Sequence, residues 1–445
     1  MNSLDMKPAR KLTERTLFPK SAPNLELITL AKAHSPELYA CVEANFDSTE
    51  LKAGTVWAGY GMEFLFVVEA ATAPSLMIDG AAGPAMQAIS GSKLWFVLAP
   101  IEGTGRLHQF HYVADGTRFG GSLDVPAFGP LSYLRPGIPT GQLSEKLIHT
   151  SKIYDGMKSE YWVYVPAQYN PSTAAAVMVF QDGAGYIDRE SNNPALNVID
   201  NLIAEKKIPV MICVFIEPGD ISDSPGTPTY NFVKEHSDKW SRTLKYGMRS
   251  VLYDTVSDRY PRFLRDELLA EVESNYKLRK DAYSRAITGM SSGAICSFNA
   301  AWQLPEVFSR VISWMGSFTC MQWRADPANP DGGQDYPEKV LREPHRNLRV
   351  WLQDGANDME NARWGSWPMA NLRMANALKT RGYDFHFSFG HGTHNTAHGA
   401  AEFPREMIWL WRGYDQAQTA QEFTIEPEEV AKPFFRVAVT NRDCE

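Results

Sequence analysis

The chain has 445 residues, of which 44% are hydrophobic, 22% charged and 12% aromatic. This composition is ordinary for a globular protein and excludes a disordered, collagen-like or low-complexity chain. The net charge is −8 and there is no basic run. Because nucleic-acid-binding proteins neutralise phosphates with Lys and Arg, we expect no nucleic acid partner.

The first 24 residues carry charges throughout and lack the apolar core of a signal peptide. We therefore expect a soluble protein, either cytoplasmic or secreted with its signal removed. No run of about 18 apolar residues is present, so no membrane partner is expected. The sequence leaves a homo-oligomer open.

Short β-type runs separated by Gly, Asp and Pro fill the region from Glu26 to Asp124. This spacing predicts a β-sandwich domain of the Ig-like or carbohydrate-binding kind over residues 1–125. Residues 126–142 are rich in Pro and Gly, which is typical of a linker. The β-type runs are Thr55–Ala58, Glu63–Val68, Ser75–Gly80, Lys93–Leu98 and His108–Val113.

Apolar strand-like runs alternate with amphipathic helical stretches over residues 143–414, and residues 415–445 form a C-terminal extension. The alternation predicts an α/β domain with a mostly parallel central sheet covered on both faces. Sites in such sheets lie beyond the carboxyl ends of the strands. The predicted strands include Tyr161–Val165, Val177–Phe180, Val210–Ile216, Ala286–Thr288, Arg349–Leu352 and Phe385–Phe389, and the predicted helices are Ala195–Ala204, Tyr260–Val272, Gly293–Gln303 and Trp367–Thr380.

The pentapeptide Gly289-Met-Ser291-Ser-Gly293 stands between a short β run and an apolar helical run. This strand–turn–helix setting is that of the GxSxG turn, which presents a serine hydroxyl on a strained backbone. We therefore predict Ser291 as a nucleophile. The alternative is a Gly/Ser-rich turn that only caps the helix.

A serine nucleophile requires a base and a group that orients the base, in the chain order Ser, acid, His for this fold. The strand Arg349–Leu352 leads to Asp354 and Asp358, and we favour Asp358 because it lies deeper in the loop. Asp354, at the strand end, is the alternative acid, or it braces the loop through backbone NH groups.

The strand Phe385–Phe389 runs into a loop with His391, His394 and His398. We favour His394 as the base, whereas His398 is placed behind it and His386, within the strand, is expected in the core. Three histidines this close also suit zinc. However, no HExxH motif or carboxylate-rich partner accompanies them, so we predict no metal and no cofactor.

An oxyanion hole requires two NH donors directed at the developing oxygen. The NH of Ser292, directly after the nucleophile, is one expected donor. The strand Val177–Phe180 runs into Gln181-Asp-Gly183-Ala184, where glycine allows close approach of the backbone to a substrate. We choose Ala184 as the second donor, the alternative being a simple β-turn.

These motifs together resemble the enterochelin esterase-like branch of the esterase D family, over Leu143 to Arg412. The resemblance implies an α/β-hydrolase with Ser291, Asp358 and His394 as its triad and Ala184 as an oxyanion donor, preceded by a β-sandwich domain. Two departures stand out: Ala294 replaces a common second glycine, and the base loop is Thr393-His-Asn395. The segments that carry the resemblance are Val179–Tyr186, Gly289–Gly293, Leu352–Asp358 and Gly392–His394.

In this family the segment before the helix that begins near Tyr260 borders the pocket. Tyr253, Asp254 and Arg259 are therefore candidate substrate contacts, together with Gly183, although a structural ion-pair network is the equal alternative for the first three. Trp364 and Trp367, after Asp358, and His398 complete the candidates. Both tryptophans suit the wall of an acyl pocket or the protein core.

The sequence thus predicts a serine carboxylic ester hydrolase that acts on a small-molecule ester of a sugar, a phenolic acid or a siderophore. An acyltransferase or a peptidase using the same three residues is the alternative within catalysis. A glycan-binding protein with an inactive hydrolase body is the alternative outside it, with Trp57, Tyr60 and Trp95 as ligand contacts.

Overall fold

The computed structural model describes residues 22–220, 244–321 and 332–437, which fall into two compact units. The first unit extends to Pro136 and also includes Asp188–Asn201 and Thr396–Arg405; the second holds the remaining residues. Strand β8 (Thr117–Ala127) ends inside the stretch that the sequence predicts as a linker, so Pro126 and Ala127 belong to a strand.

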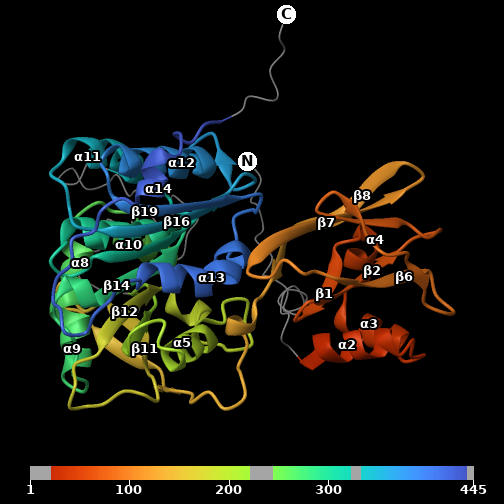
Figure 1. Cartoon of the computed structure of the whole chain (residues 1–445), viewed down its shortest axis with the longest axis horizontal. Coiled ribbons are helices and arrows are strands. Elements are labelled where there is room, and N and C mark those ends of the chain that lie inside the picture. Colours follow the sequence, from red (N-terminus) through yellow and green to blue (C-terminus); the bar gives the residue numbers. More distant parts are fainter. Residues whose placement is uncertain (1–21, 221–243, 322–331, 438–445) are drawn as a thin grey trace, which may run out of the picture. The chain divides into compact units, whose positions relative to one another are not determined.

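Among the described residues, three helices precede the strands of the first unit, and the sequence analysis did not predict them (Figure 1). They are α2 (Ala22–Lys32), α3 (Leu38–Asn45) and α4 (Ser48–Ala53). The local signals exist, because Asp47 caps α4 by accepting from the NH of Thr49, and Gly54 ends it at φ +69°. The expectation of β-type runs from Glu26 onward was therefore wrong for residues 26–53.

Two antiparallel four-stranded sheets follow, and they share one apolar layer. Phe64 and Phe66 of the first sheet pack in one cluster with Phe110 and Tyr112 of the second, and the rings of Phe66 and Phe110 lie 4.8 Å apart. The first sheet has the order β1 (Val56–Tyr60), β2 (Glu63–Glu69), β6 (Leu94–Pro100) and β5 (Gln87–Ala88); the second has the order β4 (Ala81–Ala82), β3 (Ser75–Ile78), β7 (Arg106–Ala114) and β8.

The aromatic residues considered for glycan binding do not form an exposed platform. Trp57 is buried in the layer between the sheets. The indole NH of Trp95 donates to the carbonyl of Ala70, and the partly exposed ring of Tyr60 packs edge-on against Tyr133.

The second unit is built on a nine-stranded sheet in which β12, β13, β14, β15, β16 and β19 run parallel, as the sequence predicts. Strand β11 pairs antiparallel with β9, β10 and β13. In spatial order the strands are β10 (Leu147–Thr150), β11 (Lys158–Val165), β13 (Met211–Ile216), β12 (Ala176–Gln181), β14 (Arg285–Met290), β15 (Arg310–Trp314), β16 (Arg349–Gly355) and β19 (Asp384–Gly390), with β9 (Gln142–Leu143) beside β11.

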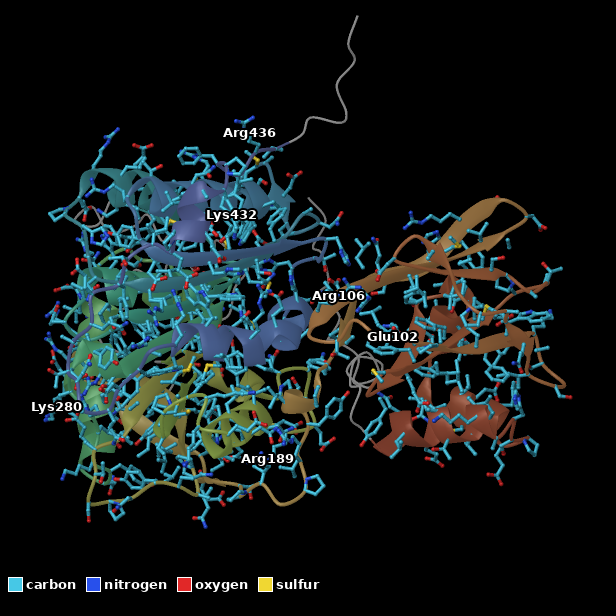
Figure 2. The ribbon with its side chains drawn as sticks, in the orientation of Figure 1. Glu102, Arg106, Arg189, Lys280, Lys432 and Arg436 are labelled. Carbon is cyan, nitrogen blue, oxygen red and sulfur yellow. The ribbon has the colours of Figure 1, made fainter. Side chains whose placement is uncertain are left out.

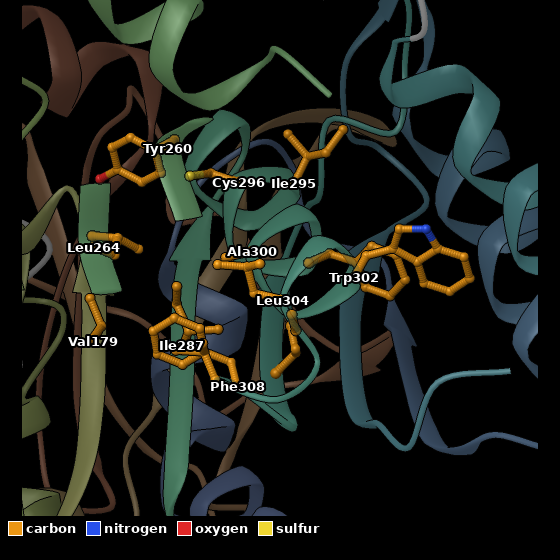
Figure 3. Close-up of a cluster of buried hydrophobic side chains, with 14 of the residues drawn as sticks. Val179, Tyr260, Leu264, Ile287, Ile295, Cys296, Ala300, Trp302, Leu304 and Phe308 are labelled. Atoms are coloured by element: carbon orange, nitrogen blue, oxygen red, sulfur yellow. The ribbon is translucent and has the colours of Figure 1, made fainter. Parts of the chain in front are cut away.

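Every residue of β12, β13, β15 and β16 is buried, which agrees with a parallel sheet that is covered on both faces. On one face, Val179 and Ile287 pack against Leu264, Ala300 and Phe308 (Figure 3). The described α-helices after Gly137 are α5 (Ala195–Ala204), α7 (Leu244–Tyr253), α8 (Arg259–Phe263), a π-turn (Leu264–Leu268) leading into α9 (Leu269–Glu273), α10 (Ser292–Gln303), α11 (Tyr336–Arg342), α12 (Trp367–Thr380), α13 (Ala397–Leu410) and α14 (Pro427–Ala431).

Strand β15 lies between β14 and β16 and was not predicted, because a charged residue opens it. The side chain of Arg310 is fully buried, with Nε donating to the carbonyl of Tyr283 at 2.9 Å. Its guanidinium lies 5.0 Å from the ring centre of Tyr283 and 4.8 Å from that of Trp411. Aromatic faces and a backbone carbonyl thus accommodate a charge that the sequence pattern argues against.

The described part of the C-terminal extension docks on the second unit. Asn376 of α12 exchanges two hydrogen bonds with the backbone of Phe435, at 3.0 and 2.9 Å.

Charged side chains cover the outer surface, including Lys280 beside Glu273 at 3.1 Å (Figure 2). Among the helices of the described residues, none combines the length and apolarity that a bilayer span requires.

Candidate active site

Ser291 lies at the sharp turn between β14 and α10, with φ 54° and ψ −118°. A non-glycine residue at positive φ is strained, as the predicted turn requires. The two flanking glycines make the turn sterically allowed. A Cβ on Gly289 would lie 2.5 Å from the carbonyl of Gly293, so the backbone segments could not approach as they do.

The side chains of Ser291, His394 and Asp358 form one continuous hydrogen-bonded chain. His394 Nε2 lies 3.0 Å from Ser291 Oγ, and His394 Nδ1 lies 2.5 Å from Asp358 Oδ1. The carboxyl of Asp358 is fully buried, whereas the imidazole is 21% exposed. Loops after β14, β16 and β19 supply the three residues, in the order that the sequence analysis expects.

The acid loop and the histidine loop are held together by backbone contacts. The NH of Ala356 donates to the carbonyl of Gly390 at 2.9 Å, and that of Asn357 to Gly392 at 3.2 Å. A Cβ on Gly355 would lie 2.2 Å from the carbonyl oxygen of Gly392, so glycine is required at this position. These contacts fix the distance between the carboxylate and the imidazole.

Asp354 does not contact His394 but lies behind Asp358, fully buried. Its Oδ1 accepts from the NH of Gly355 and its Oδ2 from Asn371 Nδ2, both at 2.8 Å. Burial and the neighbouring Asp358 raise the pKa of Asp354 well above its usual value. Burial alone would also raise the pKa of Asp358, but hydrogen bonds from His394 and Asp354 outweigh it and lower that pKa.

Ser317 and Trp367 support the nucleophile and the base from one side. Ser317 Oγ lies 3.2 Å from Ser291 Oγ and accepts a hydrogen bond from Trp367 Nε1 at 3.1 Å. The indole also meets the imidazole of His394 edge-on, with ring centres 5.6 Å apart. Trp367 is fully buried, so it packs against these side chains instead of forming the exposed wall of an acyl pocket.

The two expected oxyanion donors differ in their surroundings. Ser292 is the first residue of α10, where backbone NH groups have no acceptor within the helix. The NH of Ala184, in the 3₁₀ turn Gly183–Gly185, donates to Glu217 Oε1 at 2.9 Å. In this structure the second expected donor is therefore hydrogen-bonded to a carboxylate. Gly183 is buried, and a Cβ there would lie 2.5 Å from the backbone nitrogen of Ile216.

A bidentate ion pair anchors the loop that carries Ala184. Arg249 Nε and Nη2 donate to the two oxygens of Asp182 at 2.8 and 2.6 Å, and Asp182 has φ +53°. Burial lowers the pKa of Arg249, but the charge of Asp182 overcomes this and raises it. The NH of Asp182 also donates to the hydroxyl of Tyr253, at 3.4 Å.

Most of the predicted substrate contacts bond to the protein itself. Tyr253 is fully buried, and Asp254 accepts from Ser250 Oγ at 2.8 Å. Arg259 Nη2 donates to the carbonyl of Ile153 at 2.7 Å, with its guanidinium over the ring of Tyr154. These contacts match the structural alternative.

The remaining candidates are Trp364, on the loop before α12, and His398, on α13. Trp364 is half-buried, and its carbonyl accepts from the NH of Cys320 at 2.9 Å. His398 Nε2 lies 3.5 Å from Glu402 on the same helix, and His386 stacks on Trp351 as expected of a packed residue. Within residues 22–220, 244–321 and 332–437, no group of three or more His, Cys, Asp or Glu side chains is arranged to hold a metal ion.

Sequence reasoning missed three contributors, namely Ser317, Arg249 and Glu217. Ser317 follows β15, an unpredicted strand, so its place at a carboxyl end was not visible. Glu217 follows Ile216, the last residue of a strand that was predicted. A search of every polar residue after each strand would have found Glu217. Nothing local to Arg249 marks it as the partner of Asp182.

Comparison with known families places the chain in a class of enzymes. Residues 156–410 match the family described as "Putative esterase". The match covers more than half of the chain, so the chain belongs to this esterase family and is a hydrolase with an α/β-hydrolase fold. The resemblance to an esterase family that the sequence motifs carry is thereby confirmed.

Several solved structures are similar to the chain. An enterobactin esterase from Shigella flexneri is 15% identical, with 81% of this chain and 97% of that chain covered and a TM-score of 0.49. A ferric enterobactin esterase from Salmonella typhimurium is 14% identical, with 79% and 93% covered and a TM-score of 0.49. A ferulic acid esterase from Anaeromyces mucronatus is 15% identical, with 64% and 95% covered and a TM-score of 0.43.

Proposed function

We propose that this esterase hydrolyses a small carboxylic ester through an acyl-enzyme on Ser291, with His394 as base and Asp358 as the acid that orients it. The observation that carries the proposal is the continuous hydrogen-bonded chain from Ser291 Oγ through both imidazole nitrogens to Asp358. Family membership supports carboxylic ester hydrolysis.

In the first step, Ser291 Oγ attacks the ester carbonyl carbon while its proton moves to His394 Nε2. Asp358 accepts the hydrogen bond from Nδ1, which keeps Nε2 available as the acceptor and stabilises the imidazolium that forms. The tetrahedral intermediate collapses as His394 returns the proton to the departing alcohol oxygen. The acyl group remains on Ser291.

The tetrahedral oxygen carries a negative charge that requires NH donors. We assign the NH of Ser292 as the first donor, supported by its place at the start of α10. The NH of Ala184 is the second, and it must exchange Glu217 Oε1 for the substrate oxygen.

In the second step, water enters where the alcohol departed and gives a proton to His394 as it attacks the acyl carbon. Ser291 leaves with that proton and the free acid is released. The buried carboxylate of Asp358 serves both steps equally, because the same imidazolium forms in each.

We place the protein in the enterochelin esterase-like branch on its motifs, and sugar, phenolic and siderophore esters are its candidate substrates. The half-buried Trp364, on the loop after Asp358, is the proposed wall of the acyl pocket. A panel of acetyl, feruloyl and macrolactone esters distinguishes these classes by kcat/KM.

Hydrolysis of p-nitrophenyl acetate tests the nucleophile. We expect Ser291→Ala to lose essentially all activity with its circular dichroism unchanged. Ser274→Ala, at an exposed serine after α9, is the matched control and keeps full activity. Unchanged hydrolysis in Ser291→Ala refutes the assignment. Transfer of the acyl group to an added alcohol in place of water identifies the acyltransferase alternative. Cleavage of peptides and not of esters identifies the peptidase alternative.

A further inference from the structure

We propose that Asp354 is a positioning residue that carries a proton at neutral pH and donates it as a hydrogen bond to the carboxylate of Asp358. The proposal adds a fourth group to the chain that begins at Ser291. Its kinetic consequences rest on the proposed function, whereas the location of the proton does not.

The surroundings of Asp354 do not favour a negative charge. The side chain is fully buried near the end of β16, and each of its oxygens accepts one neutral NH, from Gly355 and from Asn371. No ion pair of Asp354 with a cationic side chain occurs within the described residues. An ionised carboxyl in such a place would be strongly destabilised by the loss of its hydration.

The surroundings of Asp358, by contrast, favour a negative charge. One of its two carboxylate oxygens still lacks a hydrogen-bond donor within the described ranges. Its Oδ1 accepts from His394 Nδ1 and from the NH of Met359. Its Oδ2 is buried and has no NH or hydroxyl donor among the described residues. A buried carboxylate oxygen without a donor is costly.

The carboxyl groups of Asp354 and Asp358 interact directly, since each shifts the pKa of the other, and Asp358 Oδ2 is a buried oxygen without a donor in the described part of the chain. Two carboxyl groups in contact can share a hydrogen bond only if one of them carries a proton. Because Asp358 is committed to accepting from His394, the proton resides on Asp354. The titratable groups facing Asp354 are thus Asp358 and, beyond it, His394. Asn371 on α12 and Phe389, its partner on β19, are neutral.

The opposite pKa shifts of the two carboxyl groups agree with this assignment, since burial raises the pKa of Asp354 and hydrogen bonding lowers that of Asp358. The consequence for acyl transfer is geometric and electrostatic. A donor at the far oxygen fixes the rotation of the Asp358 carboxylate and keeps a single negative charge behind the imidazole.

Infrared difference spectroscopy locates the proton without reference to activity. At pH 7 we expect the wild-type protein to show the carbonyl stretch of a buried protonated carboxylic acid, which Asp354→Asn loses. Asp266→Asn, at a half-exposed carboxylate paired with Arg265, is the matched control and leaves the band unchanged. A wild-type protein without the band, or Asp354→Asn with it, overturns the proposal.

Kinetics tests the role of the hydrogen bond. Asp354→Asn retains a donor and should keep kcat within about threefold, whereas Asp354→Ala should lower kcat about 10- to 100-fold with KM nearly unchanged. Equal losses of kcat in both variants would mean that a charged Asp354 is required, and they overturn the proposal. Full activity of Ser291→Ala refutes the proposed function instead and leaves the infrared result standing.

Discussion

Two pairs of acidic side chains lie at the carboxyl ends of the parallel strands, and the protein balances their charges differently. Asp354 is the penultimate residue of β16 and Asp358 follows the strand; their carboxyl groups interact with each other, and neither forms an ion pair with Lys or Arg among the described residues. Asp182 and Glu217 follow β12 and β13, where Arg249 neutralises Asp182 and an NH group binds Glu217.

The difference follows from what each pair faces. The pair after β16 faces an imidazole that becomes positive during acyl transfer, so one negative charge is useful and a second is removed by a proton. The pair after β12 and β13 borders the NH groups proposed to bind an oxyanion. A negative charge there would oppose the reaction, so a bidentate arginine compensates it.

The charge on Asp358 gives the largest expected effect. Asp358→Asn keeps the shape but offers an amide to His394 Nδ1, which favours the wrong tautomer of the imidazole. We expect kcat for p-nitrophenyl acetate to fall about 10³- to 10⁴-fold. A loss below tenfold would show that the two acidic pairs do not differ in the way described.

The arginine of the second pair gives the next effect. Arg249→Met leaves Asp182 uncompensated and removes two charge-assisted hydrogen bonds, so we expect kcat to fall about 10- to 100-fold. Arg262→Met breaks an exposed pair with Asp258 and is the matched control, with kcat unchanged. If kcat of Arg249→Met were as high as that of Arg262→Met, the ion pair of Arg249 with Asp182 would have no role in the reaction.

The support of the nucleophile by Trp367 and Ser317 gives a smaller effect. Trp367→Phe removes the NH that donates to Ser317 Oγ, worth about 1 kcal/mol, so kcat should fall about fivefold. Ser317→Ala should cost a similar amount. Because the two side chains act through one hydrogen bond, the double variant should lose little more than either single one. Fully additive losses would contradict this coupling.

The proton on Asp354 gives an effect on stability instead of on kcat. A carboxyl whose pKa is raised in the folded protein contributes stability below its unfolded value of about 4 and loses it as pH rises towards the folded value. The wild-type protein should therefore lose stability relative to Asp354→Asn above about pH 4, by up to about 1.4 kcal/mol per pH unit. Urea unfolding at pH 5 and pH 7 measures this; a constant difference would argue against it.

The sequence predicted the three central residues because Ser291, Asp358 and His394 each follow a strand whose apolar run is readable. The sequence favoured Asp358 over Asp354, and Asp358 is the one that contacts His394 in the structure; only side-chain packing reveals that Asp354 lies behind it. Strand β15 was not predicted because it begins with Arg310, whose charge is accommodated by aromatic rings and backbone carbonyls distant in the sequence. Ser317, which follows this strand, was therefore not considered as a site residue. Contacts between distant segments, such as Arg249 with Asp182, leave no local pattern.

The expected second oxyanion donor shows another limit of sequence reasoning. The Asp-Gly turn suggested Ala184 as a donor, but nothing in the turn indicates that Glu217 accepts its NH. Likewise, Asp47 and Gly54 carry helix-end signals that the surrounding β-type runs outweighed. Helices α2, α3 and α4 pack Leu27, Val42 and Leu51, respectively, onto the first sheet, which a local pattern does not show.

Covalent labelling with a fluorophosphonate tests the central claim, that His394 activates Ser291, most directly. The reagent modifies only a hydroxyl whose proton a neighbouring base removes. Peptide mass analysis should locate one adduct, on Ser291, in the wild-type protein, and labelling should slow by orders of magnitude in His394→Ala. An adduct on a different residue, or equal labelling rates in both proteins, would contradict the account.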